Sequence, residues 1–130
     1  MIKYYSMAIE NGNSVAMFNL GNYYKEQENY NNMINYYSMA IKNGNSEAMF
    51  NLGYYYKKNK DYDNMIKYYS MAIKNGDSDA MNNLGVYYEE NKDHDNMMKY
   101  YLMAIKNGNT KAINNLDIYY KQQKDYNDTR

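Results

Sequence analysis

The sequence contains no cysteine, no proline and no tryptophan, and only two of its 130 residues are phenylalanine. Without cysteine the chain can form neither disulfides nor thiolate metal sites. Fifteen basic and fifteen acidic residues give a formal net charge of zero, so the basic excess typical of nucleic-acid-binding proteins is missing. No apolar run approaches the roughly 18 residues of a membrane span, and the N-terminus has no signal-peptide core. We therefore expect an intracellular, cytoplasmic protein that does not enter a membrane.

Tyrosine and methionine are abundant instead, with 20 and 12 copies, and they recur with a period of 32 residues. The pair Tyr4-Tyr5 returns at 36–37, 68–69 and 100–101. Leu20-Gly21 returns at 52–53 and 84–85, and as Leu116-Asp117 in the last copy. A fixed period between roughly 20 and 50 residues is typical of solenoids. The sequence therefore predicts repeat units near residues 1–32, 33–64, 65–96 and 97–128.

Each unit contains two amphipathic patterns with a helical period. Ala48, Leu52 and Tyr55 share one face of the first pattern, and Met65 and Tyr69 share one face of the second. The predicted fold class is an all-α solenoid of antiparallel helix pairs, forming a single domain over residues 1–124 with a frayed tail at 125–130. About eight helices are expected, at residues 2–10, 14–26, 30–42, 46–58, 62–74, 78–90, 94–106 and 110–123.

The segments between the patterns have the composition of helix ends. Asn43 and Gly44 tolerate the left-handed conformation that terminates a helix. Ser46, with Asn45 just before it, can accept from the free N–H groups of the next helix. The polar run at residues 57–61 forms the other turn of the unit.

These patterns resemble a known repeat family. Met49-x2-Leu52-Gly53-x2-Tyr56, followed by Met65-x3-Tyr69 and Ala72, is similar to the tetratricopeptide signature. Residues 36–48 resemble the related Sel-one-like repeats even more closely. The chain departs from both in its shorter period, in Met where Trp is usual, and in the missing closing Pro. The resemblance implies a protein-interaction scaffold and no catalytic chemistry.

The second and third units differ at eight positions, and five of these form one stripe of the first helix, at residues 47, 50, 54, 57 and 58. In the resembling families this face lines the concave groove. Exposed positions can also drift, yet Ser38 and Lys42 are unchanged at 70 and 74. We therefore expect a protein or peptide partner to contact Val15, Phe18, Asn22, Glu47, Phe50, Tyr54, Lys57, Asp79, Asn82, Val86, Glu89, Lys111, Asn114 and Ile118.

Two residue types in this stripe allow alternative interpretations. Phe18 and Phe50 occupy equivalent positions, where the later units carry Asn82 and Asn114, so the groove is expected to be apolar first and polar later. Each Phe could instead pack between adjacent first helices. An asparagine recurs in every unit and could hold a ligand backbone, but bonding to a neighbouring helix is favoured. These asparagines are Asn19, Asn51, Asn83 and Asn115.

The remaining candidates are interpreted as structural. The stripes Tyr36, Met39 and Tyr68, Met71 are predicted to be core. His94 is the chain's single histidine, and the adjacent Asp93 and Asp95 favour helix capping over metal binding. We therefore expect no metal, no cofactor and no enzyme activity.

Two other functions remain open at this point. Helical repeats can bind RNA, which neutral charge and the acidic third unit oppose. A purely structural, self-associating repeat protein is the other alternative. Residues 1–9 repeat the internal pattern, whereas Asp117 replaces glycine in the last unit. We therefore expect a genuine C-terminal end, and weak homo-association through the N-terminal face.

Overall fold

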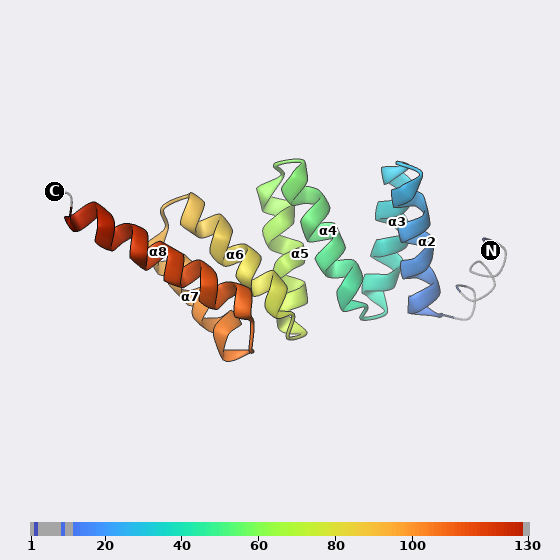
Figure 1. The fold of residues 1–130 in the computed structure, drawn as a ribbon. Helices are drawn as coiled ribbons and strands as arrows, with labels where there is room; N and C mark the ends of the chain where they lie inside the picture. The colour runs from blue at the N-terminus through green and yellow to red at the C-terminus, as the bar shows by residue number, and fades with distance from the viewer. Residues whose placement is uncertain (1, 3–8, 10–11, 129–130) are drawn as a thin grey trace. The chain divides into compact units, whose positions relative to one another are not determined.

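The computed structural model describes Ile2, Ile9 and residues 12–128, and within them it contains seven α-helices and no strand (Figure 1). Six helices have the predicted bounds, which confirms the all-α class and the helix pairs. The predicted helix at 2–10, with Tyr4 and Tyr5, lies outside the described residues apart from Ile2 and Ile9. The helices are α2 (Ser14–Glu26), α3 (Tyr30–Lys42), α4 (Ser46–Lys58), α5 (Tyr62–Lys74), α6 (Ser78–Glu90), α7 (His94–Lys106) and α8 (Thr110–Asp128).

The turns follow two alternating designs. After α3, Gly44 adopts a φ of 83° and Asn45 caps α4, its side chain accepting from the Ala48 N–H at 2.9 Å. The capping acceptor is thus Asn45, while Ser46 is already helical. After α4, Lys60 takes the left-handed conformation with a φ of 59°, and Asp61 caps α5. Both designs satisfy N–H groups that a helix start leaves unpaired.

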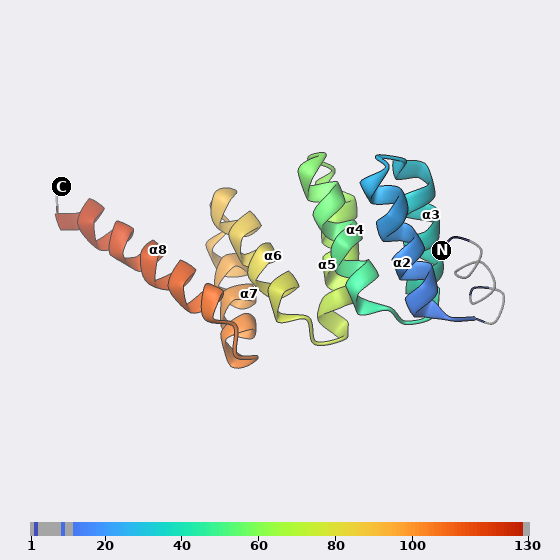
Figure 2. The ribbon, with the colours of Figure 1, turned by 45° about the vertical axis from the view of Figure 1, so that its right-hand side comes forward.

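The helices pack in pairs, α2 with α3, α4 with α5 and α6 with α7 (Figure 2). We call α2, α4, α6 and α8 first-type helices, and α3, α5 and α7 second-type helices. The chain divides into two compact units, unit 1 (Met1–Asn75) and unit 2 (Gly76–Arg130). Within unit 1, α3 also packs against α4, and within unit 2, α8 packs against α7 and α6.

Each pair buries the same side chains. In the α4–α5 pair, Ala48, Leu52, Met65 and Tyr69 are at most 1% exposed. The Tyr69 ring lies against Gly53, where an added Cβ would be only 2.5 Å from its Cδ1 atom. Glycine is therefore required at this position for the two helices to approach each other.

The core stripes predicted at Tyr36 and Met39, and at Tyr68 and Met71, are wrong by one residue position. Tyr36 is half-buried and Met39 is 36% exposed, whereas Tyr37 is fully buried. Likewise Tyr68 and Met71 are only half-buried, while Tyr69 is fully buried. The face toward the first-type helix runs through residues 33, 37 and 40, at spacings of four and three. Tyr36 lies beside this face and stacks on Tyr24 with a centroid distance of 5.5 Å.

The last helix differs from its prediction. α8 continues to Asp128, so residues 125–128 are helical where a frayed tail was expected, and residues 121–128 are all exposed. In α4 the chain turns at the equivalent residues because α5 packs back against it. Without such packing, the α8 backbone continues its i→i−4 hydrogen bonds. None of the described helices is long and apolar enough to cross a membrane.

Candidate partner-binding site

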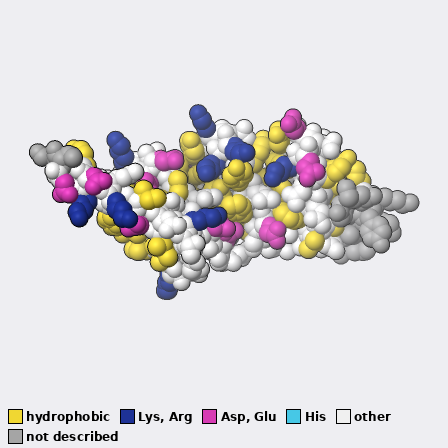
Figure 3. Space-filling view, in the orientation of Figure 1, with side chains coloured by type: hydrophobic (Ala, Val, Ile, Leu, Met, Phe, Trp, Pro, Cys, Tyr) yellow, Lys and Arg dark blue, Asp and Glu magenta, His cyan; other side chains and the backbone are white. Residues whose placement is uncertain are grey.

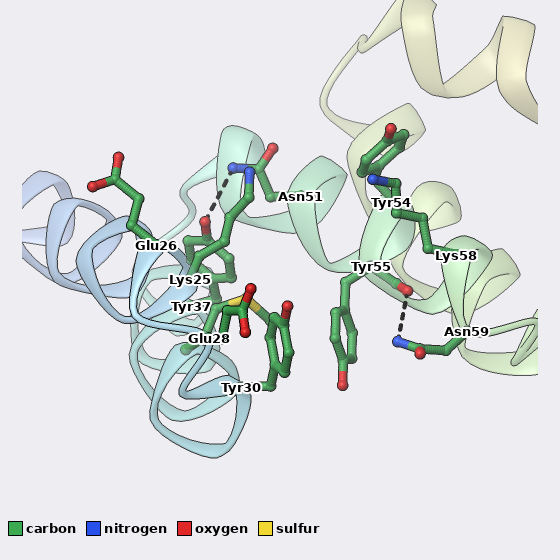
Figure 4. Close-up of a pocket in the computed structure, with 11 residues that line it drawn as sticks. Lys25, Glu26, Glu28, Tyr30, Tyr37, Asn51, Tyr54, Tyr55, Lys58 and Asn59 are labelled. Carbon is green, nitrogen blue, oxygen red and sulfur yellow. Dashed lines mark hydrogen bonds between the residues drawn. The ribbon is translucent and has the colours of Figure 1, made fainter.

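Unit 1 contains a hollow of about 380 Å³ between the α2–α3 pair and α4, which we call the tyrosine hollow (Figure 4). Its lining combines aromatic rings, amides and charged side chains from two adjacent repeats. The lining residues are Lys25, Glu26, Glu28, Tyr30, Met33, Tyr37, Asn51, Tyr54, Tyr55, Lys58 and Asn59.

The floor of the tyrosine hollow is held by a hydrogen-bonded tyrosine. The Tyr37 hydroxyl donates to Oδ1 of Asn22 and accepts from Nδ2 of Asn51 at 3.3 Å. Burial raises the pKa of Tyr37, opposed by the bond from Asn51, so this hydroxyl stays neutral near pH 7. Asn51 thus links α4 to the preceding repeat, which supports the structural interpretation of the recurring asparagines.

The walls of the tyrosine hollow are aromatic. Tyr30 and Tyr55 face each other with ring centroids 5.3 Å apart (Figure 4). Tyr54 is 38% exposed, and Nζ of Lys58 lies 4.9 Å from its ring centroid. Tyrosine faces and a nearby ammonium group offer stacking, cation–π and hydrogen-bonding contacts in one small volume.

The predicted groove residues of unit 1 have different environments. Tyr54 lines the hollow, whereas Val15, Glu47 and Lys57 are exposed outside its lining. Phe18 and Phe50 are half-buried and sit against Tyr37 and Tyr69, with centroid distances of 5.7 and 5.5 Å. Each phenylalanine therefore packs on the second-type helix of its own pair while keeping part of its ring accessible.

In unit 2, the predicted groove residues Asp79 and Asn82 on α6 contact residues on α8 or just before it. Asp79 accepts from Nδ2 of Asn109 at 2.9 Å and lies 3.9 Å from Nζ of Lys111. Asn82 is only 5% exposed and accepts from Nδ2 of Asn115 at 3.0 Å. These contacts join the first-type helices α6 and α8.

Four further predicted positions complete unit 2. Glu89 accepts from the Tyr101 hydroxyl at 2.7 Å, and Val86 is half-buried. Asn114 is exposed, and Ile118 is 52% exposed. Burial, together with the hydrogen bond to Glu89 and its charge, raises the pKa of Tyr101.

The contacts around His94 are a helix cap formed by Asp93 and an aromatic contact of the His94 ring. Asp93 accepts from the Asn96 N–H at 3.2 Å and from its side-chain amide at 2.8 Å, and these bonds lower the pKa of Asp93. The His94 ring lies 6.0 Å from that of Tyr119. In the part of the chain that the structure describes, no three His, Asp or Glu side chains are placed to hold a metal ion.

Sequence reasoning missed most of the tyrosine hollow. Its lining includes the turn after α2 and residues of α3, whereas the prediction considered only first-type helices. One signal was visible, because the position of Tyr30 and Tyr62 carries His94 in the third unit. That difference marks an inter-repeat contact and could have directed attention to Tyr30.

A statistical description of the tetratricopeptide repeat family matches residues 15–43, 46–75 and 78–107. The chain belongs to the tetratricopeptide repeat family. The three matched segments each span one first-type helix and the second-type helix that follows it. Repeats of this family generally act as protein-interaction scaffolds and are typically non-catalytic.

Solved structures with the same fold extend this assignment. A Sel1 repeat protein from Oxalobacter formigenes is 28% identical with a TM-score of 0.76, over 85% of this chain and 50% of that one. The protein c5321 is a protective antigen of uropathogenic Escherichia coli with an SLR fold. It is 27% identical with a TM-score of 0.70, over 85% of this chain and 26% of that one. The chain thus spans half or less of either protein's length. No curated protein matches it in sequence.

Proposed function

We propose that this tetratricopeptide repeat chain is a scaffold that binds a peptide or protein segment along its first-type helices. The tyrosine hollow carries this proposal. It presents ring surface from Tyr30, Tyr54 and Tyr55 beside charged side chains of both signs, Lys25, Glu26, Glu28 and Lys58. A concave, largely aromatic site with a few oriented polar groups is typical of ligand pockets.

The hollow is also supported from beneath. The bonds of Tyr37 to Asn22 and Asn51 fix its floor across two repeats. Tyrosine side chains lose little conformational entropy on binding because only two torsions are ordered. A peptide side chain entering this hollow would therefore meet a largely pre-organised surface.

The charged side chains of the hollow suggest what the segment looks like. The lining carries two lysines, Lys25 and Lys58, and two glutamates, Glu26 and Glu28. Electrostatic complementarity therefore favours a partner segment with both acidic and basic residues. The proposed partner is accordingly a segment of mixed charge that contains an aromatic or aliphatic anchor.

A displayed random-peptide library, selected on the full chain, tests the proposal. We expect enriched peptides to bind at least about tenfold more weakly to a Tyr54→Ser variant, because Tyr54 is an exposed aromatic ring that lines the hollow. Tyr126→Ser is the matched control, since Tyr126 is 59% exposed and lies outside the hollow. Fluorescence polarisation with the enriched peptides gives both affinities.

Two results would contradict the proposal. One is a library that yields no enriched peptide, and the other is an equal loss of affinity in both tyrosine variants. Salt-sensitive gel shifts with oligonucleotides, in the absence of enriched peptides, would instead favour the RNA alternative.

A further inference from the structure

α8 exposes apolar positions that the preceding first-type helices bury. Ile113 is 47% exposed, whereas Met49 at the same repeat position is 6% exposed. Leu116 is half-buried, whereas Leu52 is fully buried. α5 covers these positions on α4, but α8 continues straight to Asp128 and does not turn back. We call the surface formed by Ile113, Leu116 and Tyr120 the α8 face. In Figure 3, hydrophobic side chains gather on the surface over α7 and α8.

Tyr120 occupies a repeat position at which another aromatic ring normally stacks. In the α4–α5 pair, Tyr56 stacks on Tyr68 at 5.6 Å with nearly parallel rings, and Tyr88 and Tyr100 repeat this contact in unit 2. Tyr120 occupies the same repeat position and is 48% exposed, with its hydroxyl donating to Sδ of Met98 at 3.3 Å. A helix that covers the α8 face can therefore place a ring on Tyr120.

Asp117 restricts which helices can pack against the α8 face. At the equivalent Gly53, an added Cβ would lie 2.5 Å from the Tyr69 ring, and at Gly85 it would lie 2.4 Å from the Tyr101 ring. Asp117 has this Cβ and a carboxylate as well, so a helix with tyrosine at the facing position cannot pack in the same way. The α8 face is therefore closed to the chain's own second-type helices.

The carboxylate also offers a charge for recognition. Oδ2 of Asp117 lies 3.0 Å from Nζ of Lys121, and both side chains are mostly exposed. An exposed i,i+4 pair of this kind contributes little, so a cation from another chain can compete with Lys121. The slim stem of Lys or Arg can pass the Asp117 Cβ where a tyrosine ring cannot.

We propose that the α8 face binds an amphipathic helix of a partner protein, one that matches this chain's second-type helices but carries Lys or Arg in place of their buried tyrosine. The apolar side of that helix covers Ile113 and Leu116, and its aromatic residue stacks on Tyr120. Its cation pairs with Asp117. This surface lies on α8 and is separate from the tyrosine hollow in unit 1.

Two synthetic peptides with the sequence of residues 62–75, one unchanged and one carrying Tyr69→Lys, test this proposal. Each is titrated into the full chain and into an Asp117→Gly variant, while NMR follows the methyl groups of Ile113 and Leu116. The unmodified chain should bind the Tyr69→Lys peptide at least about tenfold more tightly than the tyrosine peptide. The Asp117→Gly chain should reverse this preference, because glycine restores the space for the ring.

An Ile113→Glu variant locates the binding. It should weaken binding of the Tyr69→Lys peptide about tenfold or more, while far-ultraviolet circular dichroism stays unchanged. The proposal is overturned if neither peptide shifts the methyl signals, or if both chains prefer the same peptide. It is equally overturned if Ile113→Glu leaves the affinity unchanged. A Tyr54→Ser variant should bind both peptides normally, which separates this surface from the tyrosine hollow.

Discussion

Replacing Gly53 with alanine has two opposing effects on the free energy of unfolding. Alanine in a helix is normally about 1 kcal/mol more favourable than glycine. At Gly53, however, the new Cβ would lie 2.5 Å from the ring of fully buried Tyr69, and overpacking of this kind costs about 1–3 kcal/mol. We therefore expect Gly53→Ala to lower the free energy of unfolding by up to about 2 kcal/mol in urea titrations.

The matched substitution is Asp117→Ala in α8. Asp117 occupies the same repeat position but is exposed, and its pair with Lys121 is a surface contact. The free energy of unfolding should change by less than about 0.5 kcal/mol. If Gly53→Ala were as mild as Asp117→Ala, the close approach of Tyr69 to α4 would not limit helix packing.

Ionisation of the Tyr101 hydroxyl makes the free energy of unfolding depend on pH in the alkaline range. Burial, then the hydrogen bond to Glu89, then the charges of Glu89 and Glu90 raise its pKa above the ordinary value of 10.0. Above about pH 10 the unfolded chain releases this proton while the folded chain retains it. The stabilising contribution is therefore complete below pH 10 and is lost as pH rises through the folded pKa. Urea midpoints measured from about pH 9 to about pH 11 should change little at first and should fall once the pH passes about 10.

Glu89→Gln isolates the contribution of the carboxylate. The amide still accepts from the Tyr101 hydroxyl but carries no charge to oppose its ionisation, so the decline between about pH 9 and pH 11 should be shallower. Tyr37, Tyr56 and Tyr88 also have raised pKa values, mainly because of burial, and should preserve part of the decline. An identical pH profile in both proteins would contradict this role of Glu89.

At the scale of the helices, the sequence was sufficient to predict the helix bounds wherever residues in the turns decide them. The bounds of α2 to α7 were predictable because each turn carries a capping side chain, as Asn45 and Asp61 show. One turn design also contains a glycine suited to positive φ, as at Gly44. These signals act through neighbouring residues alone, so no knowledge of tertiary packing was needed.

The errors arose where packing decides instead. Tyr36 and Tyr37 are adjacent and chemically identical, and only the position of the facing helix determines that Tyr37 is buried. The end of α8 was placed too early because Lys124 and Asp125 resemble the turn after α4, but no second-type helix holds them in a turn. The tyrosine hollow was mostly missed because Tyr30 and Tyr55 belong to different repeats and meet only after folding.

At the scale of the whole molecule, a repeat sequence must discriminate between its own repeats and those of another copy. Residues 1–10, of which the structure describes only Ile2 and Ile9, have second-type sequence, with Tyr5 at the repeat position of Tyr37. A heterologous contact between this segment of one copy and α8 of the next would not close, and it would build open assemblies. Asp117 opposes that contact because the described tyrosines at this repeat position, such as Tyr69, lie against a glycine.

Sedimentation velocity over a concentration series tests this discrimination. The unmodified chain should form nothing larger than the weak homo-association predicted for its N-terminal face, since such pairing involves one face of each copy and ends there. Asp117→Gly should instead form species whose size keeps growing with concentration, because α8 then accepts Tyr5 of the next copy. Adding Tyr5→Ser to Asp117→Gly should abolish this growth. If the Asp117→Gly chain sediments like the unmodified one, Asp117 does not control association between copies.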